Sequence, residues 1–511
     1  MNKSLILLII SSMYLIVACS SNQPEVEVAP AEKITAQPPT QEPAQPTEPT
    51  ATVKPTLEIT DTPEATETPI DTPIEDSGLA TNREVTETLL LEYDPNETNV
   101  IYMETSPDGY RLAYQKFTDQ GQYVVFEGQE QGPYDEIPYL LNFSPDSQHL
   151  AYVAKLGDKM FAVLDGVEQT YYDEVYPPFI FGPDSHKIAY IAIKGKKSVA
   201  VIDEQEISYD EIRSLRGSPN SQRFAFVARN LNADTFVVLD GEEGEKYDDI
   251  EIYNLDIFFS PDSQHLAYLA KEGDDWFVVL DGEEGLPSDS SNFNIVFSPD
   301  SQHFAYHAEI GDQVVIILDG QILDNKYDAS YNPVFSPDSQ RLAYIVSLNE
   351  ESFFIVDGIE DPIYEGFIHG LTFSPDGQRY AYRVMNNDEF FMVIDGEIQD
   401  GHDYLMDPIF SPDSQRVVYE TNDGEIYNLV LDGEETEGYH WIKTITFSPN
   451  SNHLLFVARD DGTLDEYVVM DGVHGKKYDE IISPIFFESK DSFHYLATLG
   501  DEVYLVEEKI K

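Results

Sequence analysis

Few side chains in this sequence have the types and spacing that catalysis requires. The chain has 11 histidines and one cysteine, and it contains neither a Gly-x-Ser-x-Gly nucleophile motif nor a His-Glu-x-x-His zinc motif. Pairs of carboxylates are unavoidable among 95 acidic residues, so they identify no general acid or base. Five histidines recur at one repeated position rather than in a cluster: His149, His265, His303, His453 and His494. The sequence therefore predicts no catalytic residue, no metal site and no cofactor, and we expect a protein that is not an enzyme.

The charge balance narrows the range of partners. Lys and Arg number 30 against 95 Asp and Glu, which gives a formal net charge of −65. Such a chain repels phosphate backbones and anionic lipid headgroups. We therefore expect no nucleic-acid partner, whereas cationic partners, metal ions and neutral ligands such as glycans remain open. An acidic surface that only keeps an exported protein soluble is the simpler alternative.

The single cysteine, Cys19, has the clearest chemistry in the chain. Lys3 precedes an apolar stretch over 5–17, which suits a signal peptide and is too short for a membrane-spanning helix. The residues Val17-Ala18-Cys19 resemble the lipobox of bacterial lipoproteins. That resemblance implies cleavage of residues 1–18, a diacylglycerol on the Cys19 sulfur and export to the outer side of the cell membrane or outer membrane. The alternative is an ordinary secretory signal with a coincidental cysteine.

Residues 19–82, which follow the predicted cleavage point, read as a linker. Pro, Thr, Glu and Ala dominate this stretch, and large apolar residues are scarce. A segment of this composition buries too little apolar surface to offset the entropy of ordering. We expect a disordered, extended spacer between the anchor and a folded region.

A motif of about 38 residues recurs from residue 83 to the C-terminus. It centres on a Ser-Pro-Asp turn followed by an apolar run with one aromatic residue, as in 143–152 and 259–268. The motif proline stands at Pro107, Pro145, Pro183, Pro219, Pro261, Pro299, Pro337, Pro375, Pro412 and Pro449, and a degenerate eleventh copy covers 486–505. A fixed period of this size indicates a repeat architecture.

Each copy predicts four short antiparallel strands. The first strand ends at the Ser-Pro-Asp turn, the second carries the aromatic residue, the third closes at an Asp-Gly hairpin, and the fourth often ends in Tyr-Asp. Four such strands per repeat are typical of a β-propeller blade. The Ser-Pro-Asp repeats resemble the WD-repeat-like blades of the TolB type. That resemblance implies an all-β propeller over residues 83–511 and no particular activity, because such blades serve many functions.

The ends of the repeat region predict ring closure. The eleventh copy lacks a fourth strand, and residues 84–94 read like a spare one, so we expect the N-terminal strand to complete the last blade. Eleven blades exceed the usual four to eight. We therefore expect two rings that share one closure rather than a single large ring.

The candidate binding residues fall on one predicted face. In a blade, the first–second and third–fourth turns share one face, and the irregular second–third and fourth–first loops share the other. The fourth–first loops carry the candidates Tyr139, Tyr176, Tyr253, Tyr331, His369, His440 and Trp441. Side chains of these types stack on sugars or anchor protein partners. The alternative is that they cover blade edges as ordinary packing.

Together these patterns predict a lipid-anchored propeller of the cell envelope that binds a protein or glycan partner without catalysis. One alternative is a propeller-type lyase or glycosidase acting on extracellular polysaccharide. That alternative requires a central funnel where groups such as His369, His402 and Arg383 converge. The other alternative is a structural spacer of the envelope.

Overall fold

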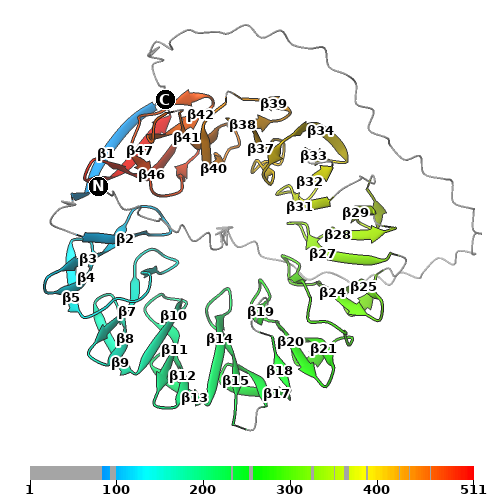
Figure 1. The fold of residues 1–511 in the computed structure, drawn as a ribbon, viewed down its shortest axis with the longest axis horizontal. Helices are drawn as coiled ribbons and strands as arrows, with labels where there is room; N and C mark the ends of the chain where they lie inside the picture. The colour runs from blue at the N-terminus through cyan, green and yellow to red at the C-terminus, as the bar shows by residue number, and fades with distance from the viewer. Residues whose placement is uncertain are drawn as a thin grey trace, which may run out of the picture. The chain divides into compact units, whose positions relative to one another are not determined.

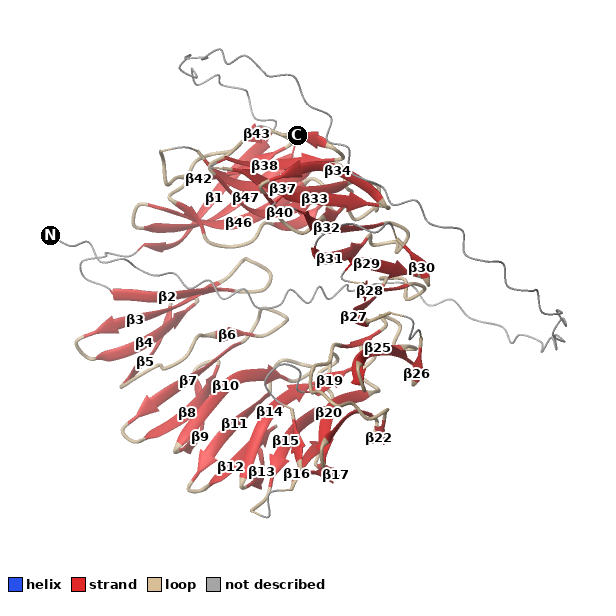
Figure 2. Cartoon of the chain, turned by 45° about the vertical axis from the view of Figure 1, so that its right-hand side comes forward, coloured by secondary structure: helices blue, strands red, loops and turns tan. Residues whose placement is uncertain are grey.

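The computed structural model describes residues 83–510, with gaps at 93–98, 232–233, 252–256, 324–326, 350, 362–366, 387–388, 425, 437 and 461. The predicted signal peptide, Cys19 and the linker lie outside the described residues. The described residues all belong to one compact unit and form strands, turns and loops without a helix (Figure 2). In this part of the chain, no helix is long and apolar enough to cross a membrane.

The strands group into eleven antiparallel units that follow the sequence repeat, and we number them blades 1 to 11. Blade 1 is β2 (Asn99–Thr105), β3 (Leu112–Thr118), β4 (Gly121–Phe126) and β5 (Gln129–Tyr134); blade 2 is β6 (Asn142–Phe143), β7 (Leu150–Leu156), β8 (Lys159–Leu164) and β9 (Val167–Tyr172); blade 3 is β10 (Glu174–Phe181), β11 (Ile188–Lys194), β12 (Lys197–Ile202) and β13 (Gln205–Tyr209); blade 4 is β14 (Glu211–Gly217), β15 (Phe224–Arg229), β16 (Thr235–Leu239) and β17 (Glu242–Tyr247). Blade 5 is β18 (Asp249–Ile250), β19 (Ile257–Phe259), β20 (Leu266–Glu272), β21 (Asp275–Leu280) and β22 (Glu283–Glu284); blade 6 is β23 (Ile295–Phe297), β24 (Phe304–Ile310), β25 (Gln313–Leu318) and β26 (Gln321–Ile322).

The remaining blades repeat this order. Blade 7 is β27 (Ala329–Phe335), β28 (Leu342–Leu348), β29 (Glu351–Val356) and β30 (Ile359–Glu360); blade 8 is β31 (Phe367–Phe373), β32 (Tyr380–Asn386), β33 (Glu389–Ile394) and β34 (Glu397–His402); blade 9 is β35 (Tyr404–Leu405), β36 (Ile409–Phe410), β37 (Val417–Asp423), β38 (Ile426–Leu431) and β39 (Glu434–Glu435); blade 10 is β40 (Trp441–Phe447), β41 (Leu454–Arg459), β42 (Glu466–Met470) and β43 (Val473–His474); blade 11 is β44 (Glu480–Ile481), β45 (Phe486–Ser489), β46 (Ser492–Leu499), β47 (Glu502–Ile510) and β1 (Arg83–Glu92). One parallel pair, Val314 with Ala329, joins the sheets of blades 6 and 7.

The N-terminal strand completes the last blade, as the sequence predicts. β1 pairs antiparallel with β47 from Arg83↔Ile510 to Glu92↔Glu502. At the Arg83 end of this pairing, Arg83 Nη1 lies 3.1 Å from Glu508 Oε2, and both side chains are almost fully buried. Arg83 Nη2 also donates to the Val473 carbonyl of blade 10 at 3.2 Å. Arg83, the first described residue, therefore bonds to both of the last two blades.

The expectation of two rings is wrong, because the blades form one closed ring (Figure 1). Each blade contacts its sequence neighbours, and the eleventh returns to the first. Successive seams are joined by the hydrogen bonds Asp108–Ser147, Tyr172–Glu206, Tyr209–Glu243, Asn220–Ser263, Asp262–Ser301, Asp300–Ser339, Arg341–Gly377, Asp376–Ser414, Asp413–Ser451, Lys443–Ile481 and His494–Asp108. Since sequence neighbours cover both faces of every blade, no face is left for a partition into two rings.

The repeated aromatic residue of the second strand supplies the core between blades. These side chains are at most 5% exposed at Tyr152, Tyr190, Phe226, Tyr268, Tyr306, Tyr344, Tyr382, Tyr419, Phe456 and Tyr495. Each packs with aliphatic residues of two adjacent blades; Tyr190, for example, packs with Ala151 and Val153 of blade 2 and Val199 of blade 3. Burial of one such side chain contributes roughly 1.5–3 kcal/mol. The periodic aromatic therefore holds each blade against the next.

Candidate binding surface on the inner strands

Hydrogen bonds between turns confirm the two predicted faces of the blades. His149, just before the second strand of blade 2, has its Nδ1 2.6 Å from Asp165 Oδ2 at the third–fourth turn. Asp135, in the fourth–first loop, accepts a bond at 2.6 Å from the amide of Gly157 in the second–third turn. We call the side with the Ser-Pro-Asp turns the regular face and the opposite side the irregular face.

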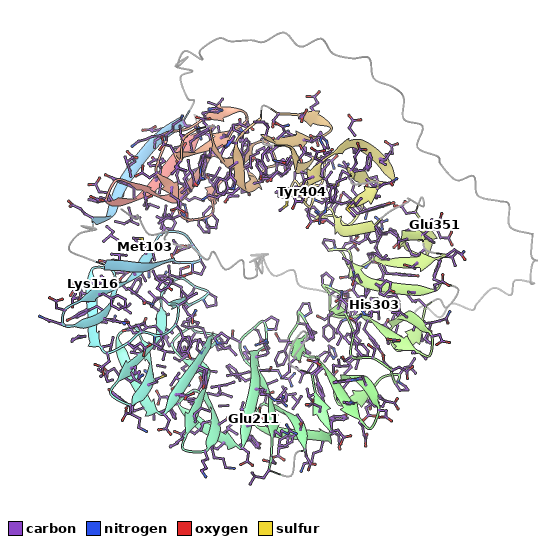
Figure 3. The ribbon with its side chains drawn as sticks, in the orientation of Figure 1. Met103, Lys116, Glu211, His303, Glu351 and Tyr404 are labelled. Carbon is purple, nitrogen blue, oxygen red and sulfur yellow. The ribbon has the colours of Figure 1, made fainter. Side chains whose placement is uncertain are left out.

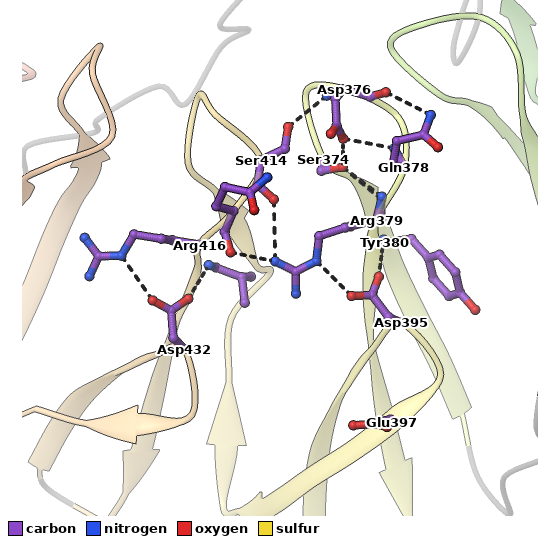
Figure 4. Close-up of polar contacts among 12 residues, drawn as sticks. Ser374, Asp376, Gln378, Arg379, Tyr380, Asp395, Glu397, Ser414, Arg416 and Asp432 are labelled. Atoms are coloured by element: carbon purple, nitrogen blue, oxygen red, sulfur yellow. Dashed lines mark hydrogen bonds and ion pairs between the residues drawn. The ribbon is translucent and has the colours of Figure 1, made fainter.

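The regular face is an inter-blade network, which explains its uniform sequence without a ligand (Figure 4). Ser374 Oγ donates to Asp376 Oδ1 at 2.6 Å within one turn. The Asp376 amide then donates to Ser414 Oγ of the next blade at 2.9 Å. Sequence reasoning assigned these residues to turn chemistry alone and missed the bond between blades.

The basic residue that begins the second strand has two forms with different reach. Arg379 Nε lies 2.8 Å from Asp395 Oδ2, and Arg379 Nη1 donates to the Gln415 carbonyl of blade 9 at 2.9 Å. His265 keeps the equivalent aspartate contact, with Nδ1 2.6 Å from Asp281 Oδ2. The shorter His265 imidazole makes this contact within its own blade. His494 of blade 11 is different, because its Nε2 lies 2.8 Å from the Asp108 carbonyl of blade 1.

The first strand of each blade lies nearest the middle of the ring, and the fourth lies at its periphery (Figure 1). Figure 3 accordingly places Tyr404, of the first strand of blade 9, at the inner edge, whereas Lys116 and Glu351 lie further out. Side chains that the first strands expose are therefore the ones available to a ligand inside the ring.

One position recurs along these first strands, and we call its residues the inner register layer. Each pairs with the residue that follows the repeated aromatic: Tyr102↔Gln115, Tyr176↔Ile191, Arg213↔Val227, Tyr331↔Ile345, His369↔Arg383 and Lys443↔Val457. In five of these six strands the register shifts directly after this position. Bulges of this kind re-aim side chains and end regular pairing.

Three candidates from the sequence, Tyr176, Tyr331 and His369, fall in the inner register layer. Tyr139 is linked to it, because Gln115 Nε2 donates to the Tyr139 carbonyl at 3.0 Å. The side chain of His369 and the whole of Tyr253 lie outside what the structure describes. The candidates whose side chains the structure describes lie in separate parts of the ring: Tyr139 before blade 2, Tyr176 in blade 3, Tyr331 in blade 7, and His440 and Trp441 at blade 10.

Several of the candidates are held by packing. The Tyr331 ring meets the buried His307 ring edge-on, with centroids 6.0 Å apart.

Trp441, next to His440, lies against Arg459 and Lys443, whose cationic groups are 4.6 Å and 5.0 Å from its ring centre. Arg459 and Lys443 also contact the buried carboxylate of Glu466, at 2.5 Å and 2.9 Å respectively. The tryptophan thus covers an ion network in blade 10.

Exposed large hydrophobic side chains occur on or next to the first strands of blades 1 to 3: Tyr102 on β2, Leu140 shortly before β6 and Tyr176 on β10. Exposed fractions are 51% for Tyr102, 48% for Leu140 and 38% for Tyr176. Tyr102 pairs across the sheet with Gln115, which bonds the chain at Tyr139, the residue before Leu140. We call Tyr102, Tyr139, Leu140, Tyr176 and Glu174 the inner aromatic patch.

Within this patch, Glu174 interacts with both Tyr176 and Tyr139. The Tyr176 hydroxyl donates to Glu174 Oε2. Burial, followed by the negative charges of Glu174 and Glu136, raises the pKa of the Tyr139 hydroxyl. Tyr139 therefore stays protonated beside carboxylates. Sequence reasoning missed Tyr102 and Leu140, although the register of the first strands places Tyr102 level with Tyr176.

Groups suited to acid–base or metal chemistry are dispersed. Burial raises the pKa of Glu420 to about 7 and lowers that of His307 to about 4, but these residues belong to blades 9 and 6. In blade 8, Arg383 on the second strand pairs with His369 on the first, whereas His402 lies on the outermost strand. Within the described ranges, no three His, Cys, Asp or Glu residues are grouped to hold a metal ion.

One cleft lies away from the inner strands. It has a volume of about 430 Å³ between blades 6 and 7 on the regular face, with Leu318, Leu342 and Tyr344 in its walls and Asp357 at its rim. It follows the short fourth strand β26 and contains none of the candidate residues.

The strand pairing defines the class of protein as an all-β propeller. No protein-family model matches the sequence, and no curated protein matches it. Solved structures that are similar include a eukaryotic initiation factor (11% identity, TM-score 0.36, covering 65% of this chain and 96% of that chain) and TolB from Acinetobacter baumannii (15%, 0.22, 66% and 80%). Another is the dihydro-heme d1 dehydrogenase NirN in complex with DHE (11%, 0.27, 55% and 70%). TM-scores of this size carry no argument about function.

Proposed function

We propose that this protein is a lipid-anchored, non-enzymatic binding or scaffold module of the cell envelope, displaying a propeller with TolB-type blades to a protein or glycan partner. Cys19 provides the anchor, residues 19–82 provide the reach, and the propeller provides the docking surface. The partner docks on the irregular, inner side, because the turns of the regular face are engaged in bonds between blades.

The observation that supports this proposal is the inner aromatic patch. Exposed tyrosines and a leucine on three consecutive blades give a partner amphipathic contact area at low cost in side-chain entropy. Among the described residues, Glu420 and His307, whose pKa values burial shifts strongly, belong to different blades. The propeller lyase or glycosidase and the envelope spacer therefore become outcomes of the test.

The test is a binding screen with the full chain purified in detergent, against a glycan array and against solubilised envelope proteins. The variant Tyr102→Ala/Tyr176→Ala removes the exposed rings of the patch. Its matched control is Tyr171→Ala. Tyr171 is 45% exposed and donates its hydroxyl to Glu168, as Tyr176 does to Glu174, but it lies on the outer strand β9.

Binding that the double variant loses and the control keeps is the expected result. Binding that survives both variants overturns the assignment of the inner surface. Conversion of an oligosaccharide by the wild type revives the lyase or glycosidase alternative, and absence of any partner leaves the spacer.

The anchor has its own test. Replacing the single cysteine by Cys19→Ser removes the only thiol that can be acylated. We expect the variant to leave the membrane fraction during fractionation, while the wild type stays in it. A variant that remains membrane-bound overturns the anchor without affecting the docking surface.

A further inference from the structure

We infer that the inner aromatic patch takes an extended glycan chain without acidic groups, laid across blades 1 to 3 with its sugar faces on Tyr102 and Tyr176. This inference rests on the proposed binding function and names the ligand class of the same surface. It follows from the spacing, the hydrogen-bonding groups and the charge of the patch.

The spacing of the patch favours a chain over a single sugar. Tyr102 and Tyr176 occupy the same register position on β2 and β10, with blade 2 and Leu140 between them. Sheets that pack face to face are about 10 Å apart. A ligand that covers both rings must therefore extend over two blade-to-blade steps, which an oligosaccharide does and a monosaccharide does not.

The side chains suit the two surfaces of a sugar ring. Half-exposed tyrosine rings stack on the apolar C–H faces, as aromatic residues do at amphipathic ligands. The exposed carboxylate of Glu174 already accepts the Tyr176 hydroxyl and retains free lone pairs for sugar hydroxyl donors. The Gln115 amide is engaged with the Tyr139 carbonyl and keeps that loop in place.

The charge of the patch excludes acidic glycans. After burial, the negative charges of Glu174 and Glu136 both raise the pKa of the Tyr139 hydroxyl, and Glu174 also accepts the Tyr176 hydroxyl. The neighbouring cation, Lys155, is engaged, with its Nζ 3.4 Å from Glu136 Oε2. The chain as a whole carries −65. A uronate or sulfate group would meet this field without a counter-charge, whereas neutral or amino sugars would not be repelled.

The experiment is a calorimetric titration of the full chain in detergent with three hexasaccharides at low salt: β-1,4-linked glucose, β-1,4-linked glucosamine and galacturonic acid. We expect the first two to bind and the galacturonic acid hexamer to bind at least tenfold more weakly. Tyr176→Ala should weaken binding about tenfold, Tyr102→Ala/Tyr176→Ala about a hundredfold, and Tyr171→Ala not measurably. Each variant is checked for an unchanged thermal unfolding midpoint, so that a loss of binding is not a loss of fold.

Three results separate the inference from the proposal beneath it. Equal binding of the galacturonic acid hexamer overturns the ligand class. No hexasaccharide binding, together with an envelope protein whose capture depends on Tyr102 and Tyr176, overturns the glycan and leaves the docking surface standing. If neither glycan nor protein binding depends on these tyrosines, the inference and the proposed function fail together.

Discussion

The amide of Asp413 donates to Ser451 Oγ at 2.9 Å, which ties the Ser-Pro-Asp turn of blade 9 to the equivalent Ser-Pro-Asn turn of blade 10. Ser451 has a φ of 60°, in the left-handed region that costs a side-chain-bearing residue roughly 1 kcal/mol and glycine almost nothing. The repeat nevertheless uses serine at most of these turns, because glycine would forfeit the acceptor. Gly109 and Gly377 are the exceptions among the motif turns.

Substitutions at Ser451 should separate the contribution of the inter-blade hydrogen bond from the cost of the positive φ. Ser451→Ala loses the inter-blade bond and keeps the unfavourable φ, so we expect a loss of about 1 kcal/mol in the free energy of unfolding. Ser451→Gly loses the same bond but relieves the backbone, and we expect it to lie within about 0.5 kcal/mol of wild type. Urea denaturation midpoints measure both. Equal losses in the two variants would show that the backbone strain is absent.

The basic residue just before the second strand is arginine in some blades and histidine in others. Exchanging one for the other should change how strongly neighbouring blades are bonded, and with it the free energy of unfolding. Arg379→His keeps a contact with Asp395 but gives up the bond from Nη1 to the Gln415 carbonyl, so we expect a loss of about 1 kcal/mol. His265→Arg should gain a similar amount by reaching the next blade. Thermal unfolding of both variants checks the pair, and a stabilised Arg379→His protein would contradict this explanation.

The buried pair Arg83–Glu508 should hold the ring closed. Arg83→Met leaves the Glu508 carboxylate without its buried counter-charge, for which losses of about 3–5 kcal/mol are typical. Adding Glu508→Gln should recover much of that loss, because the uncompensated charge is then gone. A double-mutant cycle by chemical denaturation measures the coupling. Purely additive effects would show that the two side chains do not depend on each other.

Glu420 should make stability depend on pH. Burial raises its pKa from 4.5 to about 7, so the folded chain binds more protons than the unfolded chain between these values. The contribution of Glu420 is therefore fully present below pH 4.5 and is lost as pH rises through about 7. Glu420→Gln should match wild type at about pH 5 and exceed it by about 1 kcal/mol at about pH 8, after discounting for partial exposure. The same difference at both pH values would mean that Glu420 does not titrate in this window.

The sequence was sufficient to predict the four-stranded blade, but it was not sufficient to predict how many rings the blades form. Local signals such as the Ser-Pro-Asp turn, the Asp-Gly hairpin and the buried aromatic typified by Tyr268 specify each repeat and the closure by β1. How many blades share one axis depends on small rotations at each seam. Those rotations depend on contacts such as Asp413–Ser451, between turns far apart in the chain. The expectation of two rings was wrong for that reason.

The candidate site, too, could be predicted from the sequence only in part. The repeat predicted fourth–first loops that lead to the inner strands. Tyr139 lies in such a loop, whereas Tyr176, which was predicted for one, lies on the first strand β10. Whether a tyrosine in such a loop packs or stays exposed depends on the neighbouring blade, as His307 shows beside Tyr331. Tyr102 escaped notice because its blade has no preceding repeat to mark the loop.

The most direct test of the central claim is a footprint of the tyrosines by hydroxyl-radical oxidation, with and without the partner that the binding screen identifies. We predict that the partner protects Tyr102 and Tyr176 on the inner strands and leaves Tyr171 on the outer strand as reactive as before. Protection of Tyr171 with unchanged oxidation of Tyr102 and Tyr176 would contradict binding at the inner aromatic patch.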